Sequence, residues 1–204
     1  FDNHFFGMSE DLALMLPPCQ RVCLEASLEL FHIAGYRSIE SLRGKRDIMT
    51  ITADIGVDWD IWKGYNPGTV QNFDEWLKAG ILGNSITSGN RLNYLFGLEG
   101  PAMQIDTACS ASMVGSCMGH SCIRKPNVGA DKVMVNGFQN ILTPWPFIGL
   151  SGAGMVGRTG RCLFFDQSGN GFARGEGWGG LFMKAGMSAD VVQDRLCVAA
   201  GSFV

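Results

Sequence analysis

Residues 105–112 read Ile105-Asp106-Thr107-Ala108-Cys109-Ser110-Ala111-Ser112, and the sequence on either side of them predicts a strand, a tight turn and a helix in succession. The segment 100–105 opens on a Gly-Pro turn signal and continues with residues typical of a strand. The segment 111–123 is a run of small and apolar residues without proline, closed by Arg124-Lys125-Pro126. A run of this kind favours a helix, which places Cys109 at the turn before it.

A cysteine at a helix N-terminus has a chemical advantage as a nucleophile. It faces unpaired backbone N–H groups and the positive end of the helix dipole, and both stabilise a thiolate. The same amides can hold an oxyanion that forms on an attacked carbonyl. The functional interpretation of Cys109 is therefore an acyl-accepting nucleophile. The alternative is a buried structural cysteine, which is the commoner fate of a free cysteine.

The composition excludes several classes of protein. Of 204 residues, 46% are hydrophobic, and the mean hydropathy of +0.11 is enough for a buried core and too high for a disordered chain. A net charge of −3 gives no basic surface, so we expect no nucleic acid partner. No apolar run reaches the roughly 18 residues of a membrane span. The opening residues Phe1-Asp2-Asn3-His4 lack the features of a signal peptide.

The seven cysteines indicate free thiols. Their number is odd, and they form no Cys-x-x-Cys pair, so neither a zinc ribbon nor a thioredoxin-like motif is present. Free thiols are typical of a reducing compartment. We therefore expect an intracellular, cytoplasmic protein, with an organelle as the alternative left open. The chain starts without Met and in mid-pattern, which indicates a piece of a longer protein.

Helices and strands are expected to alternate along the rest of the chain. The expected elements are a helix from Pro17-Pro18 to Gly35, a strand over 47–55, a loop and short-helix excursion over 56–82, a helix over 84–96, a strand over 131–137, a glycine-rich loop region, a strand over 180–184, a short helix near 188–194 and a final strand over 196–204. This alternation indicates an α/β protein. No internal repeat or linker predicts a domain boundary inside the chain.

Three patterns imitate ligand-binding loops without their structural context. Gly-x-Gly-x-x-Gly occurs at 152–157 and at 175–180, but neither copy lies between a strand and a helix, as a dinucleotide site requires. The segment 166–171 begins like a calcium loop, yet its twelfth position is Gly177 instead of the bidentate glutamate. We expect no dinucleotide and no metal at these places, and a turn stabilised by Asp and Asn side chains at 166–171.

A cysteine hydrolase would need a histidine beside its nucleophile. The chain offers His4, His32 and His120. His120 lies on the same predicted helix as Cys109, roughly 16 Å along it at 1.5 Å per residue, so it is out of reach. The papain-type signature and the Gly-x-nucleophile-x-Gly elbow are absent. Whether His4 or His32 folds back onto Cys109 stays open. The residues alone give an activated cysteine without an identifiable base.

Several blocks of sequence occur in the order of a known family. Together with residues 105–112, they resemble the β-ketoacyl synthase domains of modular type I polyketide synthases. The other blocks are Phe1-Asp2 with Phe5-Phe6-Gly7-Met8-Ser9; Pro18, Gln20-Arg21 and Leu24-Glu25; Ala34-Gly35-Tyr36; Asn90-Arg91-Leu92-Asn93-Tyr94 with Leu98-Glu99-Gly100-Pro101; Gly160-Arg161-Cys162 with Phe165-Asp166; and Asn170-Gly171-Phe172-Ala173-Arg174-Gly175-Glu176-Gly177.

The resemblance implies a fold and a reaction. The fold is the thiolase-like layered αβαβα arrangement of two similar βαβαβ halves, usually dimeric. Residues 1–204 correspond to a partial domain, most of the N-terminal half plus the start of the C-terminal half. Cys109 would take an acyl group from the phosphopantetheine arm of an acyl carrier protein. It would pass that group to the carbanion formed by decarboxylation of a malonyl-type extender, in polyketide or fatty-acid synthesis, without a directly bound cofactor.

The resemblance also extends to other site residues and leaves a second hypothesis open. It places Ala108 and Leu150 at the substrate, and Leu150 stands where the family often has a pocket phenylalanine. The family's catalytic histidines and lysine lie in motifs C-terminal to the matched region, and no such motif occurs before Val204. The first hypothesis is an acyltransferase with Cys109 as its nucleophile. The alternative is a truncated or degenerate ketosynthase that serves as a non-catalytic scaffold or dimerisation element.

Overall fold

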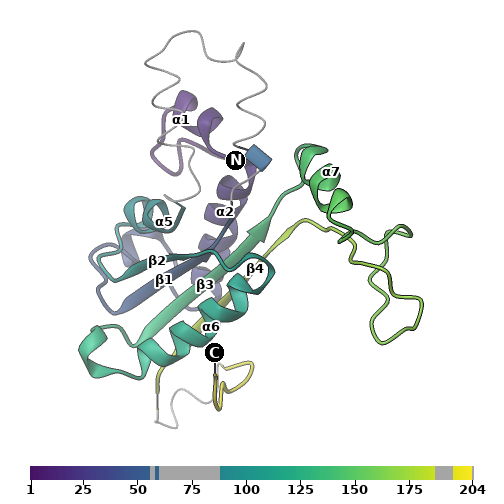
Figure 1. Ribbon diagram of the computed structural model, residues 1–204. Helices are drawn as coiled ribbons and strands as arrows, with labels where there is room; N and C mark the ends of the chain where they lie inside the picture. Colours follow the sequence, from purple (N-terminus) through teal and green to yellow (C-terminus); the bar gives the residue numbers. More distant parts are fainter. Residues whose placement is uncertain (56–57, 60–87, 187–194, 204) are drawn as a thin grey trace.

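The computed structural model describes residues 1–55, 58–59, 88–186 and 195–203 (Figure 1). Its helices are α1 (Glu10–Met15), α2 (Pro18–Ile33), α5 (Ser88–Phe96), α6 (Ala111–Ile123) and α7 (Trp145–Gly152). Short 3₁₀ turns lie at Ile39–Ser41, Ala108–Ser110 and Pro126–Val128. The strands are β1 (Ile48–Ala53), β2 (Ala102–Ile105), β3 (Lys132–Gln139) and β4 (Gly177–Lys184).

The four strands form one mixed sheet in the order β2-β1-β3-β4. β1 runs parallel to both of its neighbours, β2 and β3, while β4 is antiparallel to β3. Helices follow the parallel strands, as crossover connections require. The carboxyl end of β2 leads directly into the Cys109 turn and then into α6, so the predicted strand–turn–helix unit is confirmed.

Helices cover both faces of the sheet, and each face has its own hydrophobic core. On one face, Phe31 of α2 and Phe96 of α5 pack with Met134 of β3. On the other face, α6 covers Ile51 of β1 and Val133 of β3. β1 is buried along its whole length because helices lie above and below it. Its Ile- and Thr-rich sequence, predicted as a buried strand, is explained by this position.

Small residues bring α6 close to the sheet. A Cβ added at Gly115 would lie 3.1 Å from Cγ2 of Ile51 and 3.3 Å from Cγ1 of Val135. A Cβ added at Gly119 would lie 3.1 Å from both methyl groups of Val133. These distances leave no room for larger side chains, because protein cores are packed without spare volume. The helix that follows Cys109 therefore has a closely defined position on β1 and β3.

The N-terminal helices begin and end at the expected signals. α2 starts with Pro18 in its first turn, where a missing N–H costs nothing, and Gly35 follows its C-terminus with a φ of +95°. α1 was not predicted; the side chain of Ser9 caps it by accepting a hydrogen bond from the amide of Leu12. Before it, the rings of Phe1 and Phe6 stack with centroids 5.0 Å apart.

Residues 145–176, here named the arm, connect β3 to β4 and extend away from the sheet (Figure 1). The arm contains α7, which was not predicted, and is otherwise the expected glycine-rich loop region. It closes on itself: the amide of Gly157 donates to the carbonyl of Phe172 at 2.9 Å, and the amide of Phe172 donates to the carbonyl of Met155 at 3.0 Å. The guanidinium of Arg174 lies 4.9 Å from the centroid of the Phe147 ring.

The strand predicted over 196–204 is wrong for residues 196–203, which form no strand. A strand needs a partner with which to share its backbone hydrogen bonds. Instead, this segment is bonded to α6: the Oγ of Ser202 donates to the carbonyl of Cys117 at 3.4 Å and lies 2.7 Å from Nδ1 of His120. The helix near 188–194 and most of the excursion over 56–82 lie outside the described residues, as do residues 84–87 of the predicted 84–96 helix.

No helix in the described part of the chain is both long enough and apolar enough to cross a membrane.

Candidate active site

Cys109 lies in the 3₁₀ turn Ala108–Ser110, between the carboxyl end of β2 and the first residue of α6. Its thiol is exposed. The helix proper begins at Ala111, so Cys109 stands just ahead of the predicted helix N-terminus rather than within its first turn. The exposure argues against the alternative of a buried structural cysteine, which does describe Cys19 and Cys23. Burial raises the pKa of each of those two thiols to about 12.

The turn before Cys109 has an unusual backbone. Ala108 has a φ of +52°, a left-handed conformation that costs a non-glycine residue roughly 1–2 kcal/mol. The carboxylate of Asp106 accepts a hydrogen bond from the amide of Ala108 at 3.0 Å and so holds the strained residue from two positions upstream. This bend directs the chain from the end of β2 into the 3₁₀ turn that carries the thiol.

Two hydroxyl side chains fasten the same turn. The Oγ of Ser110 lies 2.8 Å from the carbonyl oxygen of Thr107, to which it donates, and 2.9 Å from the Thr107 hydroxyl. The amide of Ser110 also points to the Thr107 carbonyl, at 3.3 Å. Residues on both sides of Cys109 are therefore tied to each other, and the thiol is held on a short, internally bonded loop.

The backbone amide of Cys109 has no hydrogen-bond acceptor among the described residues. The neighbouring amides of Ala108 and Ser110 are both occupied, by Asp106 and Thr107. An unoccupied amide next to a nucleophile is the group that can stabilise the oxyanion formed when the nucleophile attacks a carbonyl. The arrangement can therefore support attack on a thioester by the thiol, with the amide of the same residue as donor.

Sequence reasoning assigned no role to Asp106, Thr107 and Ser110. The signal was present: Asp, Thr and Ser side chains next to a turn commonly bond to the backbone within a few residues. Gly137, which lies in β3 beneath the start of α6, was also missed. Its importance depends on a contact between two elements that are distant in the sequence, so no local pattern could show it.

The other two predicted site residues lie in different places. Ala108 is adjacent to Cys109 and exposed. Leu150 is half-buried on α7, in the arm, and α7 stands apart from α6 in Figure 1. The described elements therefore bring Ala108, but not Leu150, to Cys109.

The three histidines have other partners or are exposed. His120 is buried on α6 and lies beside Ser202, as described above. The Nε2 of His32 is 2.8 Å from the carbonyl oxygen of Arg37. His4 is exposed near the N-terminus. Within the described part of the chain, none of them is hydrogen-bonded to Cys109.

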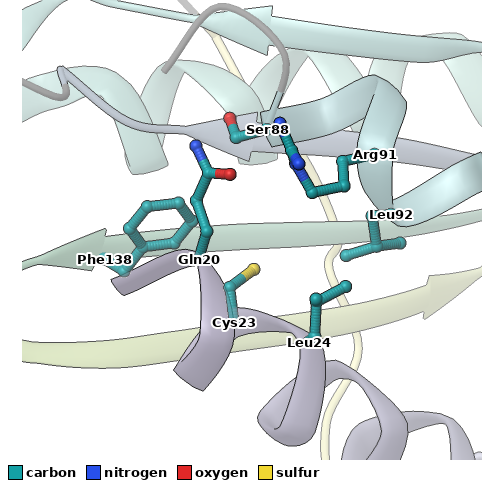
Figure 2. Close-up of a pocket in the computed structure, with 7 residues that line it drawn as sticks. All are labelled: Gln20, Cys23, Leu24, Ser88, Arg91, Leu92 and Phe138. Carbon is teal, nitrogen blue, oxygen red and sulfur yellow. The ribbon is translucent and has the colours of Figure 1, made fainter. Parts of the chain in front are cut away.

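A small cavity lies on the other side of the sheet, between α2, α5 and β3 (Figure 2). Polar groups of Gln20, Ser88 and Arg91 reach it, and burial lowers the pKa of Arg91 to about 10. Its lining residues are Gln20, Cys23, Leu24, Ser88, Arg91, Leu92 and Phe138, so it does not include Cys109. The cavity belongs to the packing between helices and sheet rather than to the candidate nucleophile.

The glycine-rich segment contains a turn where the sequence imitates a calcium loop. The carboxylate of Asp166 accepts hydrogen bonds from the amide of Ser168 at 2.8 Å and from its hydroxyl at 2.6 Å. These bonds lower the pKa of Asp166. A turn built on an Asp side chain was predicted here, and it is confirmed. No group of three His, Cys, Asp or Glu side chains within the described ranges is placed to hold a metal ion.

Comparison with known proteins gives a consistent result. The sequence model of the family described as "Beta-ketoacyl synthase, N-terminal domain" matches residues 1–189. One of the chains of the phenolphthiocerol/phthiocerol polyketide synthase of Mycobacterium tuberculosis is 35% identical over 100% of this chain. The highly reducing polyketide synthase aurA of Calcarisporium arbuscula is 34% identical over 100% of it. The chain spans only 13% and 8% of the length of these two relatives.

Solved structures show the same fold. The ketosynthase from module 6 of the bacillaene synthase of Bacillus subtilis 168 matches 96% of this chain with a TM-score of 0.76 and 28% identity. The oxazolomycin ketosynthase domain OzmH KS7 of Streptomyces albus JA3453 matches the fold with a TM-score of 0.76 at 24% identity. The chain covers 31% and 33% of those two chains. The α/β architecture is that of part of a thiolase-like ketosynthase, and the chain belongs to the β-ketoacyl synthase family, whose N-terminal domain it matches.

Proposed function

We propose that Cys109 is the acyl-carrying nucleophile of a ketosynthase domain in a polyketide synthase. The Sγ thiolate attacks the carbonyl carbon of an acyl thioester presented on the phosphopantetheine arm of an acyl carrier protein. The tetrahedral oxyanion collapses, the C–S bond to pantetheine breaks, and the carrier thiol takes up a proton. The observation that carries the proposal is the exposed thiol of Cys109 on a strained, internally bonded turn.

The amide of Cys109 has the second role in this step. It has no acceptor among the described residues, so it can donate to the oxyanion as negative charge develops there. One donor of this kind is worth about 10²–10³ in rate in enzymes where it has been removed. The left-handed conformation of Ala108 matters here, because it fixes the direction of the peptide group that carries this amide.

The condensation completes the proposed reaction. Loss of CO₂ from a malonyl-type extender on a carrier protein leaves a carbanion, which attacks the acyl carbon on Cys109. The new C–C bond forms, the C–S bond to Cys109 breaks, and the product is a β-ketoacyl thioester on the carrier. No cofactor is bound directly. Ala108 and Leu150 are proposed to contact the acyl chain, and the acting form is proposed to be a homodimer.

A second candidate is a non-catalytic ketosynthase-like scaffold or dimerisation element. One observation favours it: among the described residues, no histidine is hydrogen-bonded to Cys109. Decarboxylation and proton transfer normally use such a base. The two candidates differ in one measurable property, the ability of Cys109 to accept an acyl group.

Acylation of Cys109 tests the proposal. The full chain is incubated with hexanoyl-pantetheine, and intact mass spectrometry followed by peptide mapping locates the acyl group. We expect one hexanoyl group, on Cys109, and none in Cys109→Ala. Cys162→Ala is the matched control, because Cys162 is also an exposed thiol and its loss should leave acylation unchanged. A chain that stays unacylated, or that is acylated equally in Cys109→Ala, would contradict the proposal and favour the scaffold.

A further inference from the structure

The first turn of α6 lies directly against a glycine of the sheet. A Cβ added at Gly137 of β3 would lie 2.0 Å from Oγ and 3.1 Å from Cβ of Ser112. Both distances are below the 3.4 Å at which ordinary van der Waals contact begins. Gly137 is not among the residues with positive φ, so its backbone does not require glycine. The missing side chain is what the contact requires.

Ser112 connects this contact to the candidate nucleophile. It is the second residue of α6 and follows Cys109 by three positions. The turn before it is bonded within itself, through Asp106 to Ala108 and through Ser110 to Thr107. A displacement of the first turn of α6 therefore carries the short loop of Cys109 with it, because the loop has few independent ways to adjust.

We propose that Gly137 is a positioning residue for Cys109: by lacking a side chain, it lets Ser112 rest on β3 and so sets how far the Cys109 turn stands from the sheet. The inference rests on the proposed function, since it concerns the placement of Cys109 for attack. Gly115 and Gly119 determine how close the middle of α6 lies to the sheet, and Gly137 determines how close its beginning lies.

The substitution Gly137→Ala perturbs this one contact. The Ser112 hydroxyl must rotate away, and the remaining Cβ–Cβ distance of 3.1 Å still requires the helix start to move outward by a few tenths of an ångström. A misplacement of 1 Å can cost about 10²-fold in rate, so we expect the acylation rate of Cys109 at saturating thioester to fall about tenfold. The thioester concentration that gives half the maximal rate should not change, because no group that binds the thioester is altered.

The sheet supplies a matched control. Gly179 of β4 is the register partner of Gly137, and an added Cβ there meets nothing within 4 Å. Gly179→Ala should acylate at the wild-type rate. Gly137→Ala combined with Ser112→Gly removes both crowded atoms and should recover most of the rate relative to Ser112→Gly alone. A purely structural defect would not be repaired by a second substitution that itself weakens a helix.

The experiment measures the acylation rate of Cys109 by hexanoyl-pantetheine in the full chain, well below the thermal unfolding midpoint of each variant. If Gly137→Ala acylates as fast as the wild type, or as slowly with Ser112→Gly as without it, the positioning role is refuted while the proposed function stands. If the wild type is not acylated at all, both fall. If Gly137→Ala does not fold, Ser112→Thr crowds the same contact from the helix side, and an unchanged rate there refutes the proposal.

Discussion

Replacing Ala108 by glycine should leave the protein as stable as the wild type or more stable, although glycine usually destabilises. Ala108 has a φ of +52°, and relieving this conformation is worth roughly 1–2 kcal/mol. Glycine loses more backbone entropy on folding than alanine does, at about 0.5–1 kcal/mol. The difference predicts a net change of about 0–1 kcal/mol in favour of Ala108→Gly.

The free energy of unfolding in urea measures this change. The matched control is Ala102→Gly, since Ala102 is also exposed but lies in the regular strand β2. There the same substitution gains no strain relief and should cost about 0.5–1 kcal/mol. If Ala108→Gly destabilises as much as Ala102→Gly, the strain at position 108 is not a real feature of the folded state. A second readout is the acylation rate of Cys109, which should fall because the turn becomes less constrained.

Two further predictions concern groups that stabilise the sheet. A hydrogen bond from Lys132 lowers the pKa of Asp47 below its ordinary 3.8, so this pair adds stability that is complete above that value and lost as the pH falls through the lower folded-state pKa. Lys132→Gln should therefore lower the urea midpoint at pH 7 and have little effect near pH 2; an equal loss at both pH values would contradict the pairing. Asn93 accepts the Thr50 hydroxyl at 2.5 Å and donates to the carbonyl of Gly100 at 3.0 Å, so Asn93→Ala should cost about 1–3 kcal/mol in urea unfolding. Thr50→Val combined with Asn93→Ala should recover part of that loss, and a double variant no better than the single one would count against the hydrogen bond as the cause.

The elements that could be predicted from the sequence are those in which a local pattern and tertiary packing agree. β1 is an Ile- and Thr-rich run that helices cover on both faces, and α2 has proline in its first turn and glycine after its end. The strand–turn–helix unit around Cys109 was predicted for the same reason. Residues 196–203 have a strand pattern, but strand formation depends on a neighbouring strand, and a single segment carries no information about its neighbour.

The candidate site was only partly accessible to sequence reasoning. The position and exposure of Cys109 follow from small residues around a turn. The left-handed conformation of Ala108 does not, because alanine seldom adopts it and nothing in its side chain favours it. The role of Gly137 depends on Ser112, 25 positions earlier in the numbering, and becomes visible only when β3 and α6 are packed together.

The arm begins and ends at adjacent positions of the sheet, since Gln139 of β3 pairs with Gly177 of β4. A loop with fixed, neighbouring ends is a separable insertion in an otherwise complete hairpin. Doubling the length of such an insertion costs only about 0.6 kcal/mol in closure entropy. Arms of different length and sequence can therefore be exchanged on the same pair of strands, so natural variation or grafting at 145–176 can proceed without redesign of the core beneath Cys109.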